Sequence, residues 1–287
     1  MDYLKPAGLP EMLDVLEESR HGRCLAYAGG TDVIPRLKAR LINPPEVLVD
    51  LKGIRELDFI SYDENFGLRI GALATISSVV ANGSVRGKYP ALFEGARSIA
   101  STHIQNRATL IGNICSAVPS ADSAPALLCF GAKVICLSKG RERLMDLDQF
   151  LLGPNTTSLQ PGEIVKEIQV PPVTADMGGA YLKLSPRSRM DLAVVGVAAV
   201  VRKDHGAFGD VRIGLGAVAP TPMRATKAEQ RLRGEMISEA VILEAAKLAA
   251  RESKPIDDHR ASAAYRRMMV EVLVKRAIQQ ALSNNDH

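Results

Sequence analysis

Two adjacent glycines at the end of a short apolar run constrain this chain more than any other feature. The stretch Ala26-Tyr-Ala-Gly-Gly-Thr-Asp-Val33 passes from a strand-like run through Gly29 and Gly30 to a hydroxyl, a carboxylate and a helical pattern. Successive glycines let the backbone adopt positive φ and approach a ligand closely, and a nest of amides binds anions. Thr31 adds a hydroxyl donor, and we expect Asp32 to accept hydrogen bonds from backbone N–H groups. The stretch predicts either a phosphate-binding loop or a plain strand-to-helix turn with Thr31 as N-cap.

The two commonest nucleotide-binding motifs are absent around these glycines. The sequence has no G-x-G-x-x-G run followed about 20 residues later by an acid, which excludes the Rossmann fingerprint. No Gly-Lys-Ser/Thr follows the glycines either, so the stretch is not a Walker loop. Any phosphate bound here is bound in another way.

A second glycine-containing stretch, Asn106-Arg-Ala-Thr-Leu-Ile-Gly-Asn113, repeats the theme later in the chain. One glycine lies between hydroxyl and amide side chains, which by itself is also compatible with an ordinary turn. Asp122 follows in Pro119-Ser-Ala-Asp-Ser123. Its carboxylate suits a ribityl or ribose hydroxyl, or it caps the helix expected after it.

Composition excludes several other classes of protein. The 287 residues suggest about two domains with a sizeable core. A net charge of +4, 4% aromatic residues and no tryptophan do not indicate a nucleic-acid surface. The four cysteines lack CxxC spacing, and we expect them to be reduced and buried. The acidic start does not resemble a signal peptide, and no apolar run is long enough to span a membrane, so we expect a cytoplasmic protein.

The pattern divides the chain into three segments, 1–52, 53–174 and 175–287. The first predicts a helix from Leu9 to near Gly22, strands at 25–28 and 46–51, and helical turns at 33–41. The second predicts a hairpin at 59–72, helices at 75–82, 89–101 and 123–130, and strands at 133–137 and 163–170. The third predicts antiparallel strands at 179–184, 192–202 and 211–218, then two amphipathic helices that contain Val241–Leu248 and Val270–Leu282.

Three motifs, taken together, resemble a known family. Ala28-Gly-Gly-Thr-Asp32, Asn106-Arg-Ala-Thr-Leu-Ile-Gly-Asn-Ile114 and Pro119-Ser-Ala-Asp-Ser-Ala-Pro125 are similar to motifs of the FAD-binding (medium) subunit of molybdenum hydroxylases of the xanthine dehydrogenase and carbon monoxide dehydrogenase type. Arg260-Ala-Ser-Ala-Ala-Tyr-Arg-Arg267 resembles the signature of that family's last domain. The resemblance covers nearly the whole chain. It implies an α+β protein: a two-subdomain FAD-binding fold of the PCMH or vanillyl-alcohol-oxidase kind, then a C-terminal flavoprotein domain of antiparallel sheet with helices.

The resemblance also implies roles for individual residues. The first pyrophosphate loop matches Ala28, Gly29, Gly30, Thr31 and Asp32, with Tyr27 lining the cofactor just before it. The second loop matches Thr109, Ile111, Gly112 and Asn113, and an acidic flavin ligand matches Asp122. Positions near the flavin ring match Ile99, Ile104, Val165 and Lys183; the alternative for Lys183 is a solvated lysine on a strand.

The second loop departs from the family pattern. Ile111 stands where the family usually has the first of two glycines, and Ala108 stands where glycine is common. A Cβ at 111 restricts φ. Either the backbone there is ordinary and Ile111 packs on the flavin ring, or the loop has shifted.

The implied function is electron transfer through flavin. In the family, a large molybdopterin subunit oxidises the substrate and a small subunit with two [2Fe–2S] clusters carries the electrons to the flavin. The flavin then passes them to NAD, a quinone or another acceptor, and we expect a dimer of heterotrimers. We expect no metal, no nucleophile and no general base in this chain; His21, His103, His205, His259 and His287 are scattered. The alternatives are a stand-alone FAD oxidoreductase of the same fold and a scaffold subunit that has lost flavin.

Overall fold

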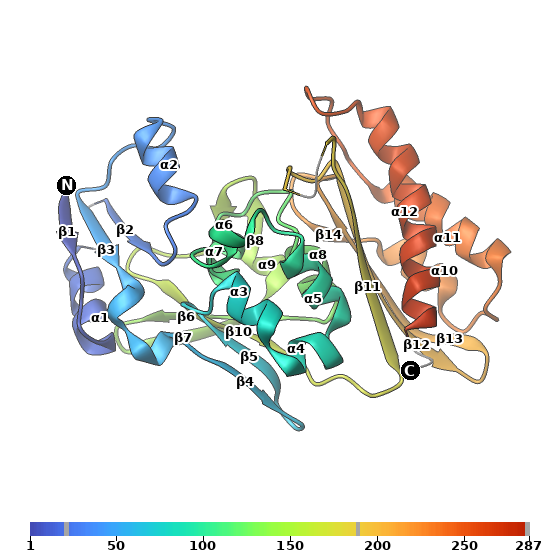
Figure 1. Cartoon of the computed structure of the whole chain (residues 1–287), viewed down its shortest axis with the longest axis horizontal. Helices are drawn as coiled ribbons and strands as arrows, with labels where there is room; N and C mark the ends of the chain where they lie inside the picture. The colour runs from blue at the N-terminus through green and yellow to red at the C-terminus, as the bar shows by residue number, and fades with distance from the viewer. Residues whose placement is uncertain (20–22, 188–189, 285–287) are drawn as a thin grey trace.

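The computed structural model describes residues 1–19, 23–187 and 190–284 and has an α+β architecture. Three main sheets follow one another along the chain (Figure 1). The N-terminal lobe carries the first sheet, the central part the second, and the C-terminal lobe the third (Figure 1). No helix in the described ranges is both long and apolar enough to cross a membrane.

The first sheet is small and parallel. Its strands are β1 (Asp2–Leu4), β2 (Cys24–Tyr27) and β3 (Val47–Asp50), in the order β1-β3-β2. Helix α1 (Leu9–Glu18) turns Met12 and Leu16 into the core, as the apolar spacing predicts. Its expected end near Gly22 lies outside the described residues, and the helix ends at Glu18. Helix α2 (Val33–Lys38) follows the glycines, and two short 3-10 turns (Leu51–Gly53 and Arg55–Leu57) follow β3.

The second sheet is antiparallel and has five strands. They are β4 (Ile60–Asp63), β5 (Gly67–Gly71), β10 (Ile164–Val170), β6 (Lys133–Ser138) and β7 (Arg141–Asp146), in that order across the sheet. A two-stranded ladder joins β8 (Leu151–Gly153) to β9 (Thr156–Thr157). The helices of this part are α3 (Ile76–Ala81), α4 (Gly83–Lys88), α5 (Pro90–Arg97), α6 (Thr102–Gln105), α7 (Leu110–Cys115), α8 (Ala124–Cys129) and α9 (Leu147–Phe150).

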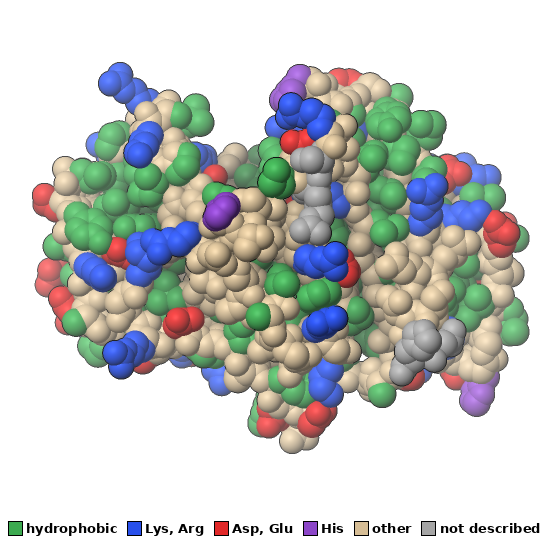
Figure 2. All heavy atoms as spheres, in the orientation of Figure 1, with side chains coloured by type: hydrophobic (Ala, Val, Ile, Leu, Met, Phe, Trp, Pro, Cys, Tyr) green, Lys and Arg blue, Asp and Glu red, His purple; other side chains and the backbone are tan. Residues whose placement is uncertain are grey.

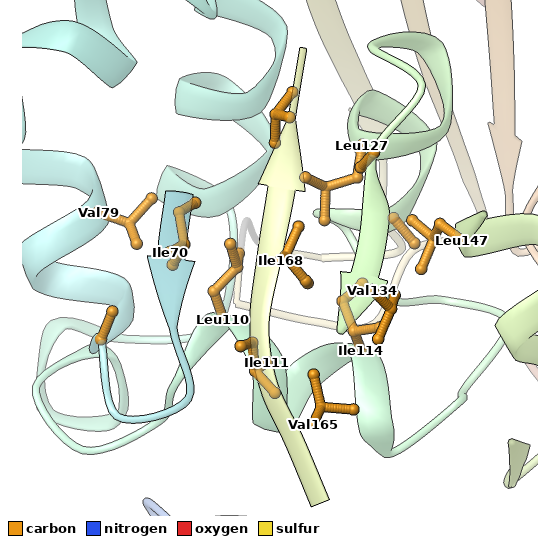
Figure 3. Packing of buried hydrophobic residues seen from close by; sticks show 14 of the residues in the cluster. Ile70, Val79, Leu110, Ile111, Ile114, Leu127, Val134, Leu147, Val165 and Ile168 are labelled. Carbon is orange, nitrogen blue, oxygen red and sulfur yellow. The ribbon is translucent and has the colours of Figure 1, made fainter. Parts of the chain in front are cut away.

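The core of the central part packs its helices against this sheet. Figure 3 shows Leu110, Ile111 and Ile114 of α7 among Val165 and Ile168 of β10, all in one buried cluster. Val165 and Ile168 are three residues apart, and the register shift in β10 between Val165 and Glu167 lets both side chains join this cluster. The core under the second glycine stretch is therefore apolar and buried.

The third sheet is antiparallel: β11 (Met177–Leu184), β12 (Val195–Asp204), β13 (Ala207–Gly216) and β14 (Met223–Arg224). Helices α10 (Thr226–Leu232), α11 (Glu239–Glu252) and α12 (Ala263–Ser283) complete this lobe. Strand β12 is buried on both faces: Ala198 and Val200 join the central core, whereas Val197, Ala199 and Val201 join the core beneath the C-terminal helices. This alternation explains its continuous apolar run and joins the lobes through a shared packed interface.

Most elements expected from the sequence are present, but several have other bounds or were not predicted. The strand expected from Leu192 begins at Val195, and the helix expected from Tyr89 to Ser101 spans only Pro90–Arg97. Strand β7 and helix α10 were not predicted. Residues 110–113, expected as a loop, form the first turn of α7.

Candidate functional site

The two glycine stretches lie in direct contact, although about eighty residues separate them in the chain. A Cβ on Gly29 would lie 2.0 Å from the carbonyl oxygen of Arg107 and 2.9 Å from Cα of Ala108. Real Cβ atoms do not approach backbone so closely, so only glycine permits this contact. The contact places the turn after β2 against the turn before α7. This arrangement is the one expected for two loops that bind the same ligand.

The first loop has backbone donors that the described protein does not use. Gly30 has φ +74°, in the region that favours glycine. The N–H groups of Gly29, Gly30, Thr31 and Asp32 make no hydrogen bond to any described residue, nor does the Thr31 hydroxyl. Four successive N–H groups without a protein partner beside a positive-φ glycine can serve as an anion-binding nest.

The roles expected for Thr31 and Asp32 within this loop are partly wrong. Asp32, not Thr31, is the N-cap of α2, and its carboxylate bonds to no backbone N–H there. The carboxylate is half exposed and accepts hydrogen bonds from Ser116 Oγ at 3.1 Å and from Arg36 at 3.4 Å. Ser116 belongs to the turn after α7, so Asp32 fixes the loop by linking it to the second stretch.

The second stretch is a capped helix start. Thr109 is the N-cap of α7, and its Oγ1 accepts from the Gly112 N–H at 3.0 Å. Ile111 has an ordinary helical backbone, as one of the two expectations states, and its side chain is buried in the core beneath the loop, beside Val165 (Figure 3). The Ile111 N–H has no described acceptor. The isoleucine is therefore compatible with a ligand at this turn, because its side chain is buried and its N–H is left without a described acceptor.

Asp122 lies at the junction of the central part and the C-terminal lobe. It accepts from the Tyr181 hydroxyl at 2.7 Å and from Lys183 Nζ at 2.8 Å, and Lys183 also donates to the Ser98 carbonyl at 3.1 Å. Burial raises the pKa of Asp122 above its usual range, against the opposing effects of Lys183 and Tyr181. Asp122 does not cap α8, whose N-cap is Ser123, and Lys183 is buried, not solvated. Two residues expected at the flavin thus form a buried ion pair between β11 and the turn before α8.

The remaining predicted residues lie at different depths. Ile99 and Val165 are buried in the central core, whereas Ile104 on α6 is 39% exposed. Asn113 accepts from the Ser123 hydroxyl at 2.7 Å, which connects α7 to the segment that holds Asp122. Ala28 is half-buried at the start of the first loop.

Several residues beneath the first loop were missed by the sequence analysis. Asp50, at the end of β3, accepts from the hydroxyls of Tyr3 at 2.6 Å and Tyr27 at 3.1 Å, and pairs with Lys52 at 2.9 Å. Burial pushes the pKa of Asp50 up, but the hydrogen bonds from Tyr3 and Lys52 outweigh it and hold the pKa at about 2. The sequence feature that could have identified Asp50 is its position at the end of a strand, beside the strand that leads into the glycine turn.

A hollow opens beside the loops. Figure 2 shows it on the upper side, between the lobe that carries α2 and the lobe that carries α12, with Lys and Arg side chains on both sides. Helices α6 and α7 lie below it in Figure 1. Positive charge at its rim suits an anionic ligand.

The expectation for the cysteines is partly correct. All four are free thiols, but only Cys129 and Cys136 are buried, whereas Cys24 and Cys115 are half-buried. In the part of the chain that is described, no group of three or more His, Cys, Asp or Glu residues could hold a metal ion. His205 is fully exposed and His103 is exposed on α6; His21 and His287 lie outside the described residues.

Comparison with known proteins identifies the family. Residues 1–173 match the model for the FAD binding domain in molybdopterin dehydrogenase, and residues 180–281 match the CO dehydrogenase flavoprotein C-terminal domain. The chain is 32% identical to the xanthine dehydrogenase FAD-binding subunit of Escherichia coli O157:H7, over 98% of this chain and 96% of that protein. It is 33% identical to the carbon monoxide dehydrogenase medium chain of Hydrogenophaga pseudoflava, over 98% of this chain and 96% of that one.

The fold gives the same result. A chain in the structure of carbon monoxide dehydrogenase from Hydrogenophaga pseudoflava, in a form that lacks the Mo-pyranopterin moiety, superposes with a TM-score of 0.93. It is 32% identical, and the match covers 99% of this chain and 98% of that chain. The protein therefore belongs to the FAD-binding medium subunits of the xanthine dehydrogenase and carbon monoxide dehydrogenase type, an oxidoreductase family with FAD as its cofactor.

Proposed function

We propose that the two loops hold the pyrophosphate of FAD between them. The observation that carries this proposal is the run of four N–H groups from Gly29 to Asp32 that have no described protein partner, set against the turn before α7. A pyrophosphate needs several donors at close range, and a nest of amides supplies them. The Ile111 N–H and the Thr31 hydroxyl add further donors. The residues present fit the cofactor.

The other predicted residues take supporting roles in this proposal. The Lys183 ammonium, held by Asp122 and by the Ser98 carbonyl, presents a fixed positive charge on the C-terminal side of the site. A fixed charge costs no reorganisation when negative charge develops nearby. We place the flavin ring near Ile99, Ile104 and Lys183, and Tyr27 beneath the first loop. Val165 supports α7 from below.

Bound flavin supplies the ability to exchange one or two electrons, which joins one-electron clusters to a two-electron acceptor. We infer that this chain takes electrons from [2Fe–2S] clusters of a small partner subunit and passes them to NAD, a quinone or another acceptor. A large molybdopterin subunit completes the complex, as a dimer of heterotrimers. Relatives of nearly equal identity are subunits of enzymes named for xanthine and for carbon monoxide. The substrate is therefore chosen in the large subunit.

Two further proposals follow from the sequence analysis. We propose domain boundaries at 52/53 and 174/175, supported by the fact that each main sheet takes its strands from one of the three segments. The cytoplasmic location stays a prediction.

The FAD site is tested by hydrogen–deuterium exchange of the purified full chain with and without added FAD. We expect a flavin absorption spectrum in the bound fraction and slower exchange in the peptides that span 26–33 and 106–114. Flavin binding without protection of these peptides would contradict the assignment of the loops, and no binding at all would leave only the scaffold alternative.

The partner assignment needs a separate experiment. Co-expression of the chain with candidate molybdopterin and iron–sulfur subunits from the same genome should yield a stable complex whose flavin is reduced when substrate is added anaerobically. A chain that purifies alone and turns over a small substrate by itself would instead support the stand-alone oxidoreductase.

A further inference from the structure

A tyrosine, an aspartate and a lysine pack together directly beneath the first loop. Tyr27 ends β2 and is paired in the ladder with Asp50, which ends β3. The Tyr27 hydroxyl donates to Asp50 Oδ2 at 3.1 Å, and Lys52 Nζ lies 2.9 Å from Asp50 Oδ1. The same ammonium lies 4.0 Å from the centre of the Tyr27 ring, within cation–π range. We call these three residues the loop trio.

The loop trio contacts the first loop at two points. A Cβ on Gly30 would lie 3.2 Å from the Tyr27 ring, so the ring supports the residue with positive φ. Lys52 Nζ also lies 3.4 Å from the carbonyl oxygen of Ala28, to which it donates. These contacts hold the loop from the side of the first sheet.

The carbonyl of Ala28 and the N–H of Gly29 belong to the same peptide unit. A peptide unit is planar, and in the trans form its C=O and N–H point in opposite directions. A donor that fixes the carbonyl therefore fixes the direction of the N–H, which points away from Lys52. The Gly29 N–H is the first of the four that have no described partner.

We propose that Lys52 is a positioning residue for the cofactor: by holding the Ala28 carbonyl, its ammonium aims the Gly29 N–H at the FAD pyrophosphate. Asp50 in turn holds the ammonium, and it is itself 3% exposed and fixed by two tyrosine hydroxyls. The inference rests on the proposed function of the first loop. Lys52 would then act on the cofactor indirectly, through the peptide unit between Ala28 and Gly29.

A second trio, with a glutamate in place of the aspartate, provides a matched control. The Tyr62 hydroxyl donates to Glu64 at 2.9 Å, and Lys88 Nζ lies 3.2 Å from Glu64 and 4.7 Å from the Tyr62 ring. This trio lies on β4, the turn after it and α4, in the lower part of Figure 1, away from α2 and α7. Lys88 donates to no loop carbonyl among the described residues.

The test measures FAD binding to the full chain for Lys52→Met, Lys52→Arg and Lys88→Met, with the melting temperature of each FAD-free variant. We expect Lys52→Met to raise the Kd for FAD about tenfold, mainly through faster dissociation, because a charge-assisted hydrogen bond is lost. Lys52→Arg restores binding to within about threefold, because the guanidinium can also donate to a carbonyl. Lys88→Met leaves the Kd unchanged. FAD-free Lys52→Arg and Lys88→Met melt within about 2 °C of the parent, whereas Lys52→Met melts about 4 °C lower because the buried Asp50 loses its cation.

Two results would overturn the inference: Lys52→Met that binds FAD as tightly as Lys88→Met, or Lys52→Arg that binds as weakly as Lys52→Met. If Lys52→Met does not fold, Lys52→Gln gives the same comparison. Failure of the proposed function is distinguished by exchange: FAD that does not protect the peptide 26–33 in the parent chain removes the first loop from the site, whatever the variants show.

Discussion

The two loops at the site both contain glycine and threonine but have different structures. The first is irregular: it depends on the absence of a Cβ at Gly29, on positive φ at Gly30 and on the loop trio beneath it. The second is the first turn of α7, closed by the Thr109 side chain and backed by the buried Ile111. A glycine beside a hydroxyl residue therefore does not specify one backbone shape. The first loop is shaped by its neighbours, whereas the second is shaped by a local cap.

Two acid–lysine pairs also differ. Asp50–Lys52 lies at the end of β3 and in the turn after it, and its lysine is 31% exposed. Asp122–Lys183 joins the central part to the C-terminal lobe, and both its side chains are less than a tenth exposed. The first pair can therefore adjust with solvent, whereas the second must stay paired because an unpaired buried charge is costly.

The largest effect is expected from Gly29→Ala. The added Cβ would lie 2.0 Å from the Arg107 carbonyl oxygen, so the loops must separate. We expect a loss of about 4 kcal/mol in the free energy of unfolding, since backbone cannot move aside cheaply, and no FAD binding at micromolar concentration. Urea unfolding and a FAD titration measure the two effects.

Gly83→Ala is the matched control for that substitution. Nothing lies within 4 Å of a Cβ on Gly83, which begins α4. Its stability should stay the same or rise slightly, because alanine favours helix over glycine. Equal behaviour of the two variants would show that the loops do not depend on their close approach.

Lys183→Met should cost about 3 kcal/mol of stability, because it leaves the buried Asp122 carboxylate without its cation. The same substitution combined with Asp122→Asn removes both charges and should cost less than the sum of the single changes. Chemical denaturation of the three variants measures the coupling. Additive losses would mean that the pair does not stabilise the junction between the lobes.

The elements that the sequence predicts well are those with strong apolar periodicity. Helix α1, the hairpin of β4 and β5, and helix α12 are present with the apolar faces that their spacing indicates, whereas the buried face of α11 is rotated toward Ile242, Ala246 and Ala249. Strand β7 was missed because Arg141–Asp146 is an edge strand with mostly exposed, charged side chains. Edge strands carry such residues to avoid pairing with other chains, which removes the apolar alternation that identifies a strand.

The sequence predicts those parts of the site that lie within a local motif. It does not predict the parts whose residues are brought together only by the fold. The contact of the two stretches was expected, because the family motifs occur together. The loop trio was not, since Asp50 and Lys52 carry no motif and become neighbours of Tyr27 only through parallel pairing of β2 with β3. The role of Asp32 was wrong because its acceptor geometry depends on Ser116, which tertiary contact brings near.

Acidification tests the pair beside the first loop. Asp50 has its pKa lowered from 3.8 to about 2 in the folded chain. A lowered folded pKa gives stability that is present above about pH 4 and is lost as the pH falls toward 2, worth about 2 kcal/mol at neutral pH. The difference in unfolding free energy between the parent and Asp50→Asn should therefore shrink as the pH is lowered from 5 to about 2. A difference that is constant over this range would mean that the carboxylate charge does not stabilise the fold.

The smallest effect on stability is expected at the second loop. The substitution there distinguishes the role of Thr109 as a helix cap from the role of the loop in binding FAD. Thr109→Ala removes the side chain that accepts from the Gly112 N–H and should cost about 1 kcal/mol of stability. Thr75→Ala removes an equivalent cap of α3, in which Thr75 accepts from the Ser78 N–H at 3.1 Å, and should cost the same. Thr75 and Thr109 pair with each other in an isolated antiparallel β-bridge, so the two substitutions lie next to each other in the fold. Only Thr109→Ala should also weaken FAD binding, by about threefold, because fraying of α7 moves the Ile111 N–H. Equal FAD affinity of the two variants would mean that the second loop contributes shape to the site but no donor.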